Sequence, residues 1–141
     1  MKIGFGSILT IYAMTAGVFF LIDLFWLGYA AKELYARHIG NLLRDQVNCP
    51  AAIAFYAIYI GGMLLFAIVP ASQGNWPLSR VALIGGLLGL FAYATFDLTS
   101  LALIRGWSTT IVILDLLWGT VLTGSTCAAV VWLSRALFKL G

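Results

Sequence analysis

Three of the five acidic residues lie inside long apolar stretches of the sequence: Asp23, Asp97 and Asp115. A charged side chain at the middle of a bilayer costs about 2.5–3.5 kcal/mol even on lenient insertion scales, so three of them in a short chain require an explanation. Carboxylates act as general acids and bases, and their oxygen atoms bind hard divalent cations. These three aspartates are therefore the candidate catalytic residues, or the candidate ligands of a metal.

A cluster of carboxylates admits three interpretations, and the sequence does not choose among them. The side chains can share protons, or they can bind a divalent cation, which is the only cofactor that the sequence suggests. They can also be structural, because a partner such as Tyr93 or Ser100 beside Asp97 would satisfy the acid and hold the helices in register. All three interpretations remain open at this point.

The elements that must position these acids are membrane helices. Hydrophobic residues make up 62% of the chain, charged residues 9%, and the mean hydropathy is +1.02, whereas soluble domains carry about 25% charged residues. A helix crosses a bilayer with roughly 20 apolar residues. We predict an all-α membrane protein in which one domain, a bundle of four transmembrane helices, has spans at about 3–29, 50–69, 78–104 and 109–135.

A polar segment at 32–48 separates the first two spans. Its apolar and charged side chains fall on opposite helical faces, which predicts a short amphipathic helix at the membrane interface. Asn48 before Pro50 is typical of a helix cap followed by proline in the first turn, and Ser108 is a candidate cap for the fourth span. Pro70 and the polar residues after it predict the end of the second span and a short loop.

The spans bring the three acids to one depth. Asp23 and Asp97 lie about six or seven residues before the ends of the first and third spans, and Asp115 lies about six residues after the start of the fourth. Because the fourth span runs opposite to the other two, all three carboxylates lie roughly 10 Å below one face, at 1.5 Å per residue. That face also carries the 32–48 segment and the turn at Arg105.

Helical spacing predicts that the acids point into the bundle. The third span has a four-residue row of Gly85, Gly89, Tyr93 and Asp97, and the fourth has Asp115, Gly119, Thr123 and Cys127. Small residues in such rows let helices approach closely. The pattern D-L-x-W begins at both Asp23 and Asp115. We predict that the substrate-binding residues are aromatic side chains near the acids and two arginines at the same face: Trp26, Tyr56, Tyr59, Tyr93, Trp118, Arg37 and Arg105.

Several functions and sites are disfavoured. The net charge of +3 comes from isolated cations, so nucleic acid is not an expected partner, whereas the lipid bilayer is. Cys49 and Cys127 lie near opposite ends of the membrane layer, which predicts neither a disulfide nor a zinc site. The first apolar stretch is too long for a signal peptide. Basic residues balance between the two faces and predict no orientation, with Lys2, Arg80, Arg135 and Lys139 opposite Lys32, Arg37, Arg44 and Arg105.

Taken together, the motifs resemble a known family over nearly the whole chain. They are I-D-L-F-W-L-G at 22–28, F-A-Y-A-T-F-D-L-T at 91–99, Gly106-Trp107, and D-L-L-W-G-T-V-L at 115–122. The chain is similar to small four-helix bacterial inner-membrane proteins of unknown function. Members of that family commonly have Y-D-L-T-N where this chain has F-D-L-T-S at 96–100. No role for an amide side chain is therefore expected at Ser100. The resemblance implies a multi-pass protein of the inner membrane and implies no activity.

Three functions remain open. The first is a membrane enzyme, or an accessory protein, that acts on a lipid or another apolar substrate through Asp23, Asp97 and Asp115. The second is a small transporter of protons, cations or a metabolite, which would work as a homo-oligomer because four helices enclose little space. The third is a non-catalytic membrane subunit that binds a partner through its glycine-lined helix faces.

Overall fold

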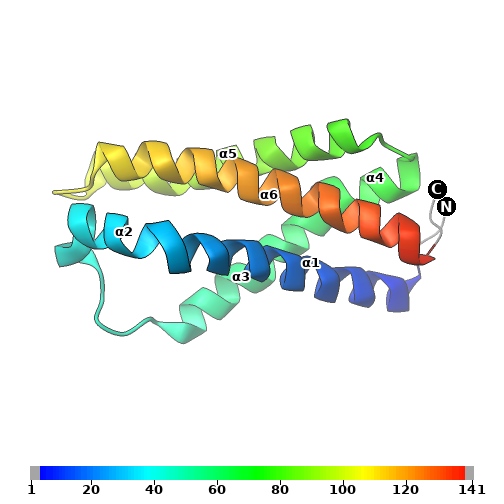
Figure 1. Cartoon of the computed structure of the whole chain (residues 1–141), viewed down its shortest axis with the longest axis horizontal. Helices are drawn as coiled ribbons and strands as arrows, with labels where there is room; N and C mark the ends of the chain where they lie inside the picture. Colours follow the sequence, from blue (N-terminus) through cyan, green and yellow to red (C-terminus); the bar gives the residue numbers. More distant parts are fainter. Residues whose placement is uncertain (1–3, 139–141) are drawn as a thin grey trace.

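A computed structural model of the chain describes residues 4–138, which form helices joined by short turns (Figure 1). The first helical segment runs without a break through α1 (Phe5–Trp26), the π-helical turn η1 (Leu27–Ala31), α2 (Lys32–Ile39) and the 3-10 turn η2 (Gly40–Leu42). The expected start of the first span at Ile3 lies outside the described residues. So do two lysines of the orientation count, Lys2 and Lys139.

The second segment also contains a π-helical turn. It consists of α3 (Cys49–Met63), η3 (Leu64–Ile68) and α4 (Val69–Gly74). The last two helices are uninterrupted and antiparallel, α5 (Leu78–Leu103) and α6 (Thr109–Phe138).

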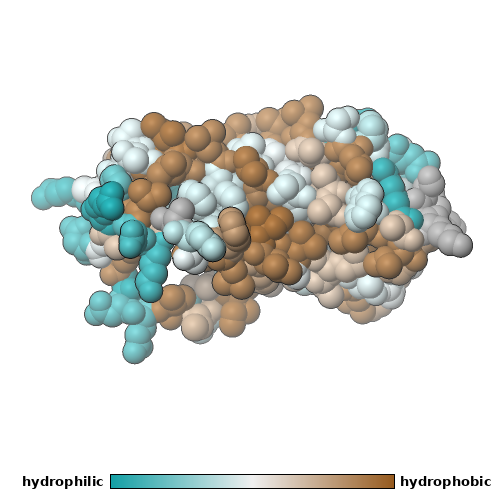
Figure 2. Space-filling view, in the orientation of Figure 1, coloured by the Kyte–Doolittle hydropathy of each residue, from teal (hydrophilic) through white to brown (hydrophobic). Residues whose placement is uncertain are grey.

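Four helical segments are long and apolar enough to cross a membrane: Phe5–Tyr29, Cys49–Gly74, Leu78–Leu103 and Thr109–Phe138. Each exceeds the roughly 20 residues that the hydrocarbon layer requires. Figure 2 shows hydrophobic residues gathered around the middle of the molecule and hydrophilic residues at its two ends. The predicted fold class is confirmed, because four apolar helices carry one short helix, 32–42, between the first two.

The helix starts follow the local sequence signals. The side chain of Asn48 accepts a hydrogen bond from the backbone N–H of Ala51 at 3.3 Å, and proline occupies the first turn of α3. The hydroxyl of Ser108 accepts in the same way from the N–H of Ile111 at 3.3 Å. Between α5 and α6, Gly106 has φ +84°, a conformation that glycine adopts without steric cost. Both predicted caps are confirmed.

Two predicted boundaries are wrong. The second helical segment continues past Pro70 to Gly74 and ends at Asn75, whose left-handed backbone (φ 53°) terminates it. Pro70 lies in the first turn of α4, directly after the π-helical turn η3, where the regular i→i−4 hydrogen-bond ladder of the α-helix is already interrupted. The helix expected over 32–48 ends at Leu42, since Gly40 is a weak helix former and the cap residue Asn48 requires a non-helical backbone.

Helices α5 and α6 pack closely along the two predicted rows of small residues. A Cβ atom on Gly85 would lie 2.9 Å from the Cβ of Cys127, and one on Gly89 would overlap the backbone carbonyl of Gly119. Gly119 in turn leaves room for the ring of Tyr93. The rows therefore face each other, as their spacing predicts.

The bundle is packed in one half and open in the other. Around Phe19, Met63 and Leu122, which are completely buried, the four helical segments form one core. Towards the end that carries the 43–48 loop, α3 diverges from α5 and α6 (Figure 1). This divergence separates the helices in the half that contains the three aspartates.

Candidate functional site

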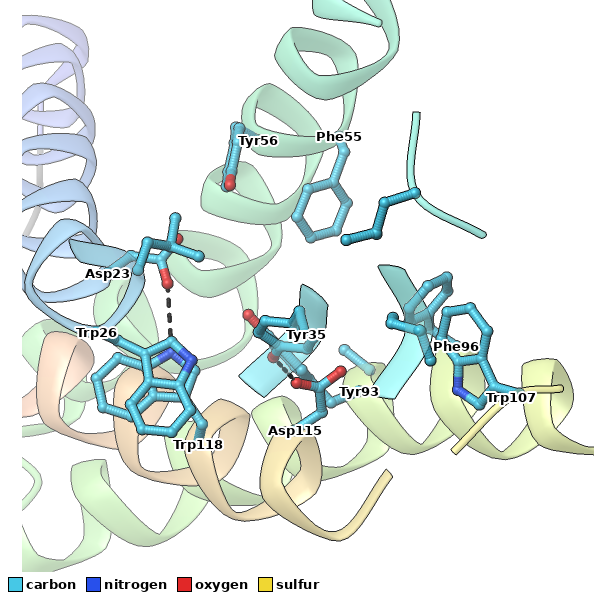
Figure 3. Close-up of a pocket in the computed structure, with 14 residues that line it drawn as sticks. Asp23, Trp26, Tyr35, Phe55, Tyr56, Tyr93, Phe96, Trp107, Asp115 and Trp118 are labelled. Atoms are coloured by element: carbon cyan, nitrogen blue, oxygen red, sulfur yellow. Dashed lines mark hydrogen bonds between the residues drawn. The ribbon is translucent and has the colours of Figure 1, made fainter. Parts of the chain in front are cut away.

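A cavity of about 580 Å³ lies in the open half of the molecule (Figure 3). Its wall is built by residues of α1, η1, α2, α3, α5 and α6, together with the loop residue Leu43 and the turn residue Trp107. Most of the wall is aromatic: Trp26, Tyr35, Phe55, Tyr56, Tyr93, Phe96, Trp107 and Trp118. A volume of this size is typical of sites for small organic ligands.

The rim of the cavity is apolar and exposed. It includes Leu27 of η1, Leu43 of the loop, Phe55 of α3 and Phe96 of α5, which are between 42% and 56% exposed. Phe55 and Phe96 lie within two of the spans, so in a bilayer their exposed surface contacts lipid. The cavity is therefore accessible from the hydrocarbon layer between α3 and α5.

Asp23 forms one polar part of the wall and is nearly buried. Its carboxylate accepts a hydrogen bond from the indole N–H of Trp118 on α6, with an N–O distance of 3.2 Å. The hydroxyl of Tyr56 on α3 points towards the same carboxylate (Figure 3). Asp23 is thus held by the indole of Trp118 and faces the cavity with its remaining surface.

Asp115 forms the second polar part of the wall. Its carboxylate accepts a hydrogen bond from the hydroxyl of Tyr35, which α2 places against α6 (Figure 3). Burial of the Tyr35 ring and the adjacent Asp115 carboxylate raise the pKa of Tyr35 above the usual value of 10.0. Tyr35 therefore stays neutral at physiological pH and keeps its proton for the hydrogen bond.

Asp97 lies behind this wall, next to Asp115 and Trp107. It is completely buried, and neither of its oxygens has a hydrogen-bond partner among residues 4–138. The indole N–H of Trp107 is also buried without a partner in the described chain. Two adjacent buried carboxylates repel each other unless a proton or a cation offsets their charge. Asp97 and Asp115 therefore act as a unit.

The two D-L-x-W motifs, at 23–26 and 115–118, contact each other. The indole rings of Trp26 and Trp118 stack with centroids 4.8 Å apart and planes at 15°. Each acid accepts a hydrogen bond from a side chain of another helix, since Trp118 donates to Asp23 and Tyr35 donates to Asp115. The N–H of Trp26 is buried and reaches no acceptor in the part of the chain that the structure describes. The motif thus pairs α1 with α6 rather than each acid with its own tryptophan.

The remaining predicted site residues divide into two groups. Tyr93 lines the cavity, whereas Tyr59 lies in the packed half and shares a hydrogen bond of 2.7 Å with the hydroxyl of Thr123. Arg37 and Arg105 are exposed and do not line the cavity. Within the described residues no group of three His, Cys, Asp or Glu side chains, the three aspartates included, is placed to hold a metal.

Sequence reasoning did not assign a site role to Tyr35, Phe55, Phe96 or Trp107. Tyr35 lies on the apolar face of the 32–42 helix, and a polar hydroxyl on that face was the available signal. Trp107 fits an aromatic belt at the membrane boundary equally well. Phe55 and Phe96 carry no local signal, because any exposed phenylalanine of a span can face lipid.

Comparisons with known proteins identify a family and nothing more specific. A family model described as "Predicted membrane protein (DUF2177)" matches residues 8–132. No curated protein and no solved structure matches the chain. The match covers most of α1 and of α6 and everything between them, and it includes every residue that lines the cavity.

Proposed function

The chain belongs to the DUF2177 family of predicted membrane proteins, and from this premise we propose that it binds a membrane lipid in the cavity and modifies that lipid or assists its modification. One observation supports the proposal above all. The same cavity combines an exposed apolar rim within the spans with the carboxylates of Asp23 and Asp115. An amphiphile that enters from the bilayer can place its chain along the rim and its polar group at the carboxylates.

The proposed chemistry is proton transfer at the polar group of the lipid. Asp115 lines the cavity and is held by the Tyr35 hydroxyl, so its carboxylate is oriented as a general base or acid must be. Asp97 lies beside it with no other partner in the described chain. Asp23 is the second polar contact of the lipid. We also propose the bacterial inner membrane as the location, because of the motif resemblance.

Transport and partner binding have less support than lipid binding. The other half of the bundle is filled by the buried side chains around Phe19, Met63 and Leu122. A polar path across the membrane would have to pass this core. The glycine rows already pack against each other between α5 and α6. Less of their surface is therefore free to contact a partner helix.

The test begins with lipid that copurifies with the chain. We expect native mass spectrometry of protein extracted in a mild detergent to detect one retained lipid per chain. Ala92 lines the cavity, so Ala92→Trp should fill it and abolish retention. Leu83→Trp is the matched control, because Leu83 is 60% exposed on the same helix and lies outside the cavity. Equal retention by both variants would rule out the cavity as the binding site.

A second measurement separates modification from binding. Lipid extracts of cells that produce the wild-type chain should differ in at least one lipid species from extracts of cells that produce Asp115→Asn at equal abundance. If Asp115→Asn retains its lipid and the extracts are identical, the chain binds lipid without modifying it, and only the accessory role stands.

A further inference from the structure

The charge of the cavity wall restricts which lipids can bind. Asp23 and Asp115 line the cavity, Asp97 lies directly behind it, and none of its lining residues is Lys, Arg or His. The basic residues at this end that are exposed and outside the wall are Lys32, Arg37, Arg44 and Arg105. An anionic group in the cavity would face carboxylates without a counter-charge, in surroundings where charges are poorly screened. Phosphate, sulfate and carboxylate head groups are therefore disfavoured.

The hydrogen-bonding groups of the wall restrict the head group further. Asp23 and Asp115 each receive one hydrogen bond from the protein, and a carboxylate has room for several more. The hydroxyl of Tyr56, beside Asp23, has a single proton, which it can donate either to the acid or to a ligand. The N–H of Trp26 is buried and therefore not open to a ligand. The wall thus offers a ligand mainly hydrogen-bond acceptors.

A head group that donates hydrogen bonds matches this arrangement better than one that only accepts. The O–H of an alcohol or the N–H of an ammonium group donates to a carboxylate. An ammonium group also offsets the charge of the carboxylates. An ester or ketone oxygen only accepts, so it would add no donor for the free lone pairs of the two carboxylates, and a buried hydrogen-bonding group without a partner is costly.

We propose that the cavity selects a lipid whose polar group donates hydrogen bonds and carries no negative charge, an alcohol or an amine. The polar group donates to Asp23 or Asp115, and the chain leaves between Phe55 and Phe96. This inference rests on the proposed lipid site and adds the chemical class of the ligand.

The test compares three probes that share one alkyl chain. Hexadecanol, hexadecane sulfonate and hexadecylamine are added in equal amounts to the delipidated protein, and occupancy is measured by native mass spectrometry. We expect the alcohol and the amine each to occupy the protein at least tenfold more than the sulfonate at pH 7. Ala92→Trp should abolish saturable binding of all three, and Leu83→Trp should abolish none.

Charge removal supplies an independent readout. In Asp23→Asn and Asp115→Asn, singly and combined, the repulsion falls while the side-chain size is kept, so the preference for alcohol over sulfonate should shrink towards equality. Each variant is first checked for an unchanged unfolding midpoint, and the wild-type series decides the matter if a variant does not fold.

The possible results separate the two proposals. Binding of the sulfonate as tight as that of the alcohol and the amine overturns the selectivity and leaves the lipid site standing. Absence of saturable binding by every probe overturns the selectivity, and it overturns the lipid site as well if no copurified lipid is found. An alcohol preference that the asparagine variants retain in full would show that the carboxylates do not cause it.

Discussion

At the scale of residues, the site is defined by which donor reaches which acid. Trp118 donates to Asp23 across the interface between α6 and α1, and Tyr35 donates to Asp115 across a sequence separation of 80 residues. Each hydrogen bond holds a carboxylate that would otherwise be buried without a partner, a state that costs about 1–3 kcal/mol. These two contacts therefore serve the fold as well as the proposed chemistry.

Tyr35→Phe tests one of these contacts. We expect the variant to lose about 1–3 kcal/mol of the free energy of unfolding at neutral pH, because Asp115 loses its donor. Since the pKa of Tyr35 is raised in the folded state, the unfolded chain loses the Tyr35 proton first as pH rises. The stabilising effect is fully present below pH 10 and declines above it.

The measurement is thermal unfolding in detergent micelles between pH 7 and pH 12, the range that brackets the usual tyrosine pKa. The difference in midpoint between wild type and Tyr35→Phe should be constant up to about pH 10 and narrow above it. Tyr29→Phe serves as the control, because Tyr29 is 84% exposed and should show no difference at neutral pH. A difference that stays constant to the highest pH would contradict the assigned role of Tyr35.

At the scale of elements, the close approach of α5 and α6 fixes the positions of the site residues that these two helices carry. The interface carries Asp97 on one helix and Asp115 on the other, at the end of the glycine rows. Without side chains at Gly89 and Gly119, the backbones approach until the two acids are adjacent. The small residues thus determine the spacing of the buried acid pair.

Gly89→Ala should weaken this interface. Its new Cβ would overlap the backbone carbonyl of Gly119, so we expect a loss of about 1–3 kcal/mol in the free energy of unfolding. Gly86→Ala is the control on the same helix, because its Cβ would meet Thr120 at an ordinary 3.4 Å. Removing a helical glycine is favourable by up to about 1 kcal/mol, so the control should be neutral or stabilised when both are unfolded in mixed detergent micelles.

The π-helical turn η1 is the second element that shapes the site. The buried positions of α1 recur every four residues from Ile11 to Asp23, a spacing that drifts around a regular α-helix. The wider turn at Leu27–Ala31 offsets this drift, so that Ala31, Tyr35 and Ile39 stay on the side of α6. Such turns occur frequently at functional sites, and here one brings Tyr35 to Asp115.

At the scale of the whole molecule, the bundle is polarised between a packed half and a hollow half. The hollow half lies at the end that carries the 43–48 loop and the Arg105 turn, and the packed half ends at the α4–α5 turn. A bilayer would cover the belt of hydrophobic residues between these ends (Figure 2). The cavity therefore opens into only one leaflet.

Cysteine labelling tests this arrangement. In a Cys49→Ser background, Asn41→Cys and Arg105→Cys should react with an impermeant maleimide from one side of sealed vesicles, and Gln73→Cys from the other side. All three positions are exposed, and the remaining Cys127 is buried. Reaction of Asn41→Cys and Arg105→Cys from opposite sides would disprove the four-span topology. The side from which Asn41→Cys reacts also assigns the compartment nearest to the cavity.

Hydropathy and helical spacing were sufficient to predict the four spans, the caps at Asn48 and Ser108, and the inward direction of Asp97 and Asp115. These features depend on neighbouring residues along one helix, so a short stretch of the sequence is enough to determine each of them. The depth of each acid follows from counting residues at a constant rise.

Only the tertiary structure decided how the helices turn and tilt against one another. Rotation of one helix about its axis leaves its own spacing unchanged, so the sequence could not specify that Trp118 reaches Asp23, or that Asp97 pairs with Asp115 and not with Asp23. The extra residue in the turn η1 and the divergence of α3 arise from packing among several elements. The three carboxylates at one depth are thus divided between two polar parts of one aromatic cavity, Asp23 and the pair of Asp97 and Asp115. Depth does not determine the position of a residue around the bundle, whereas helix packing does.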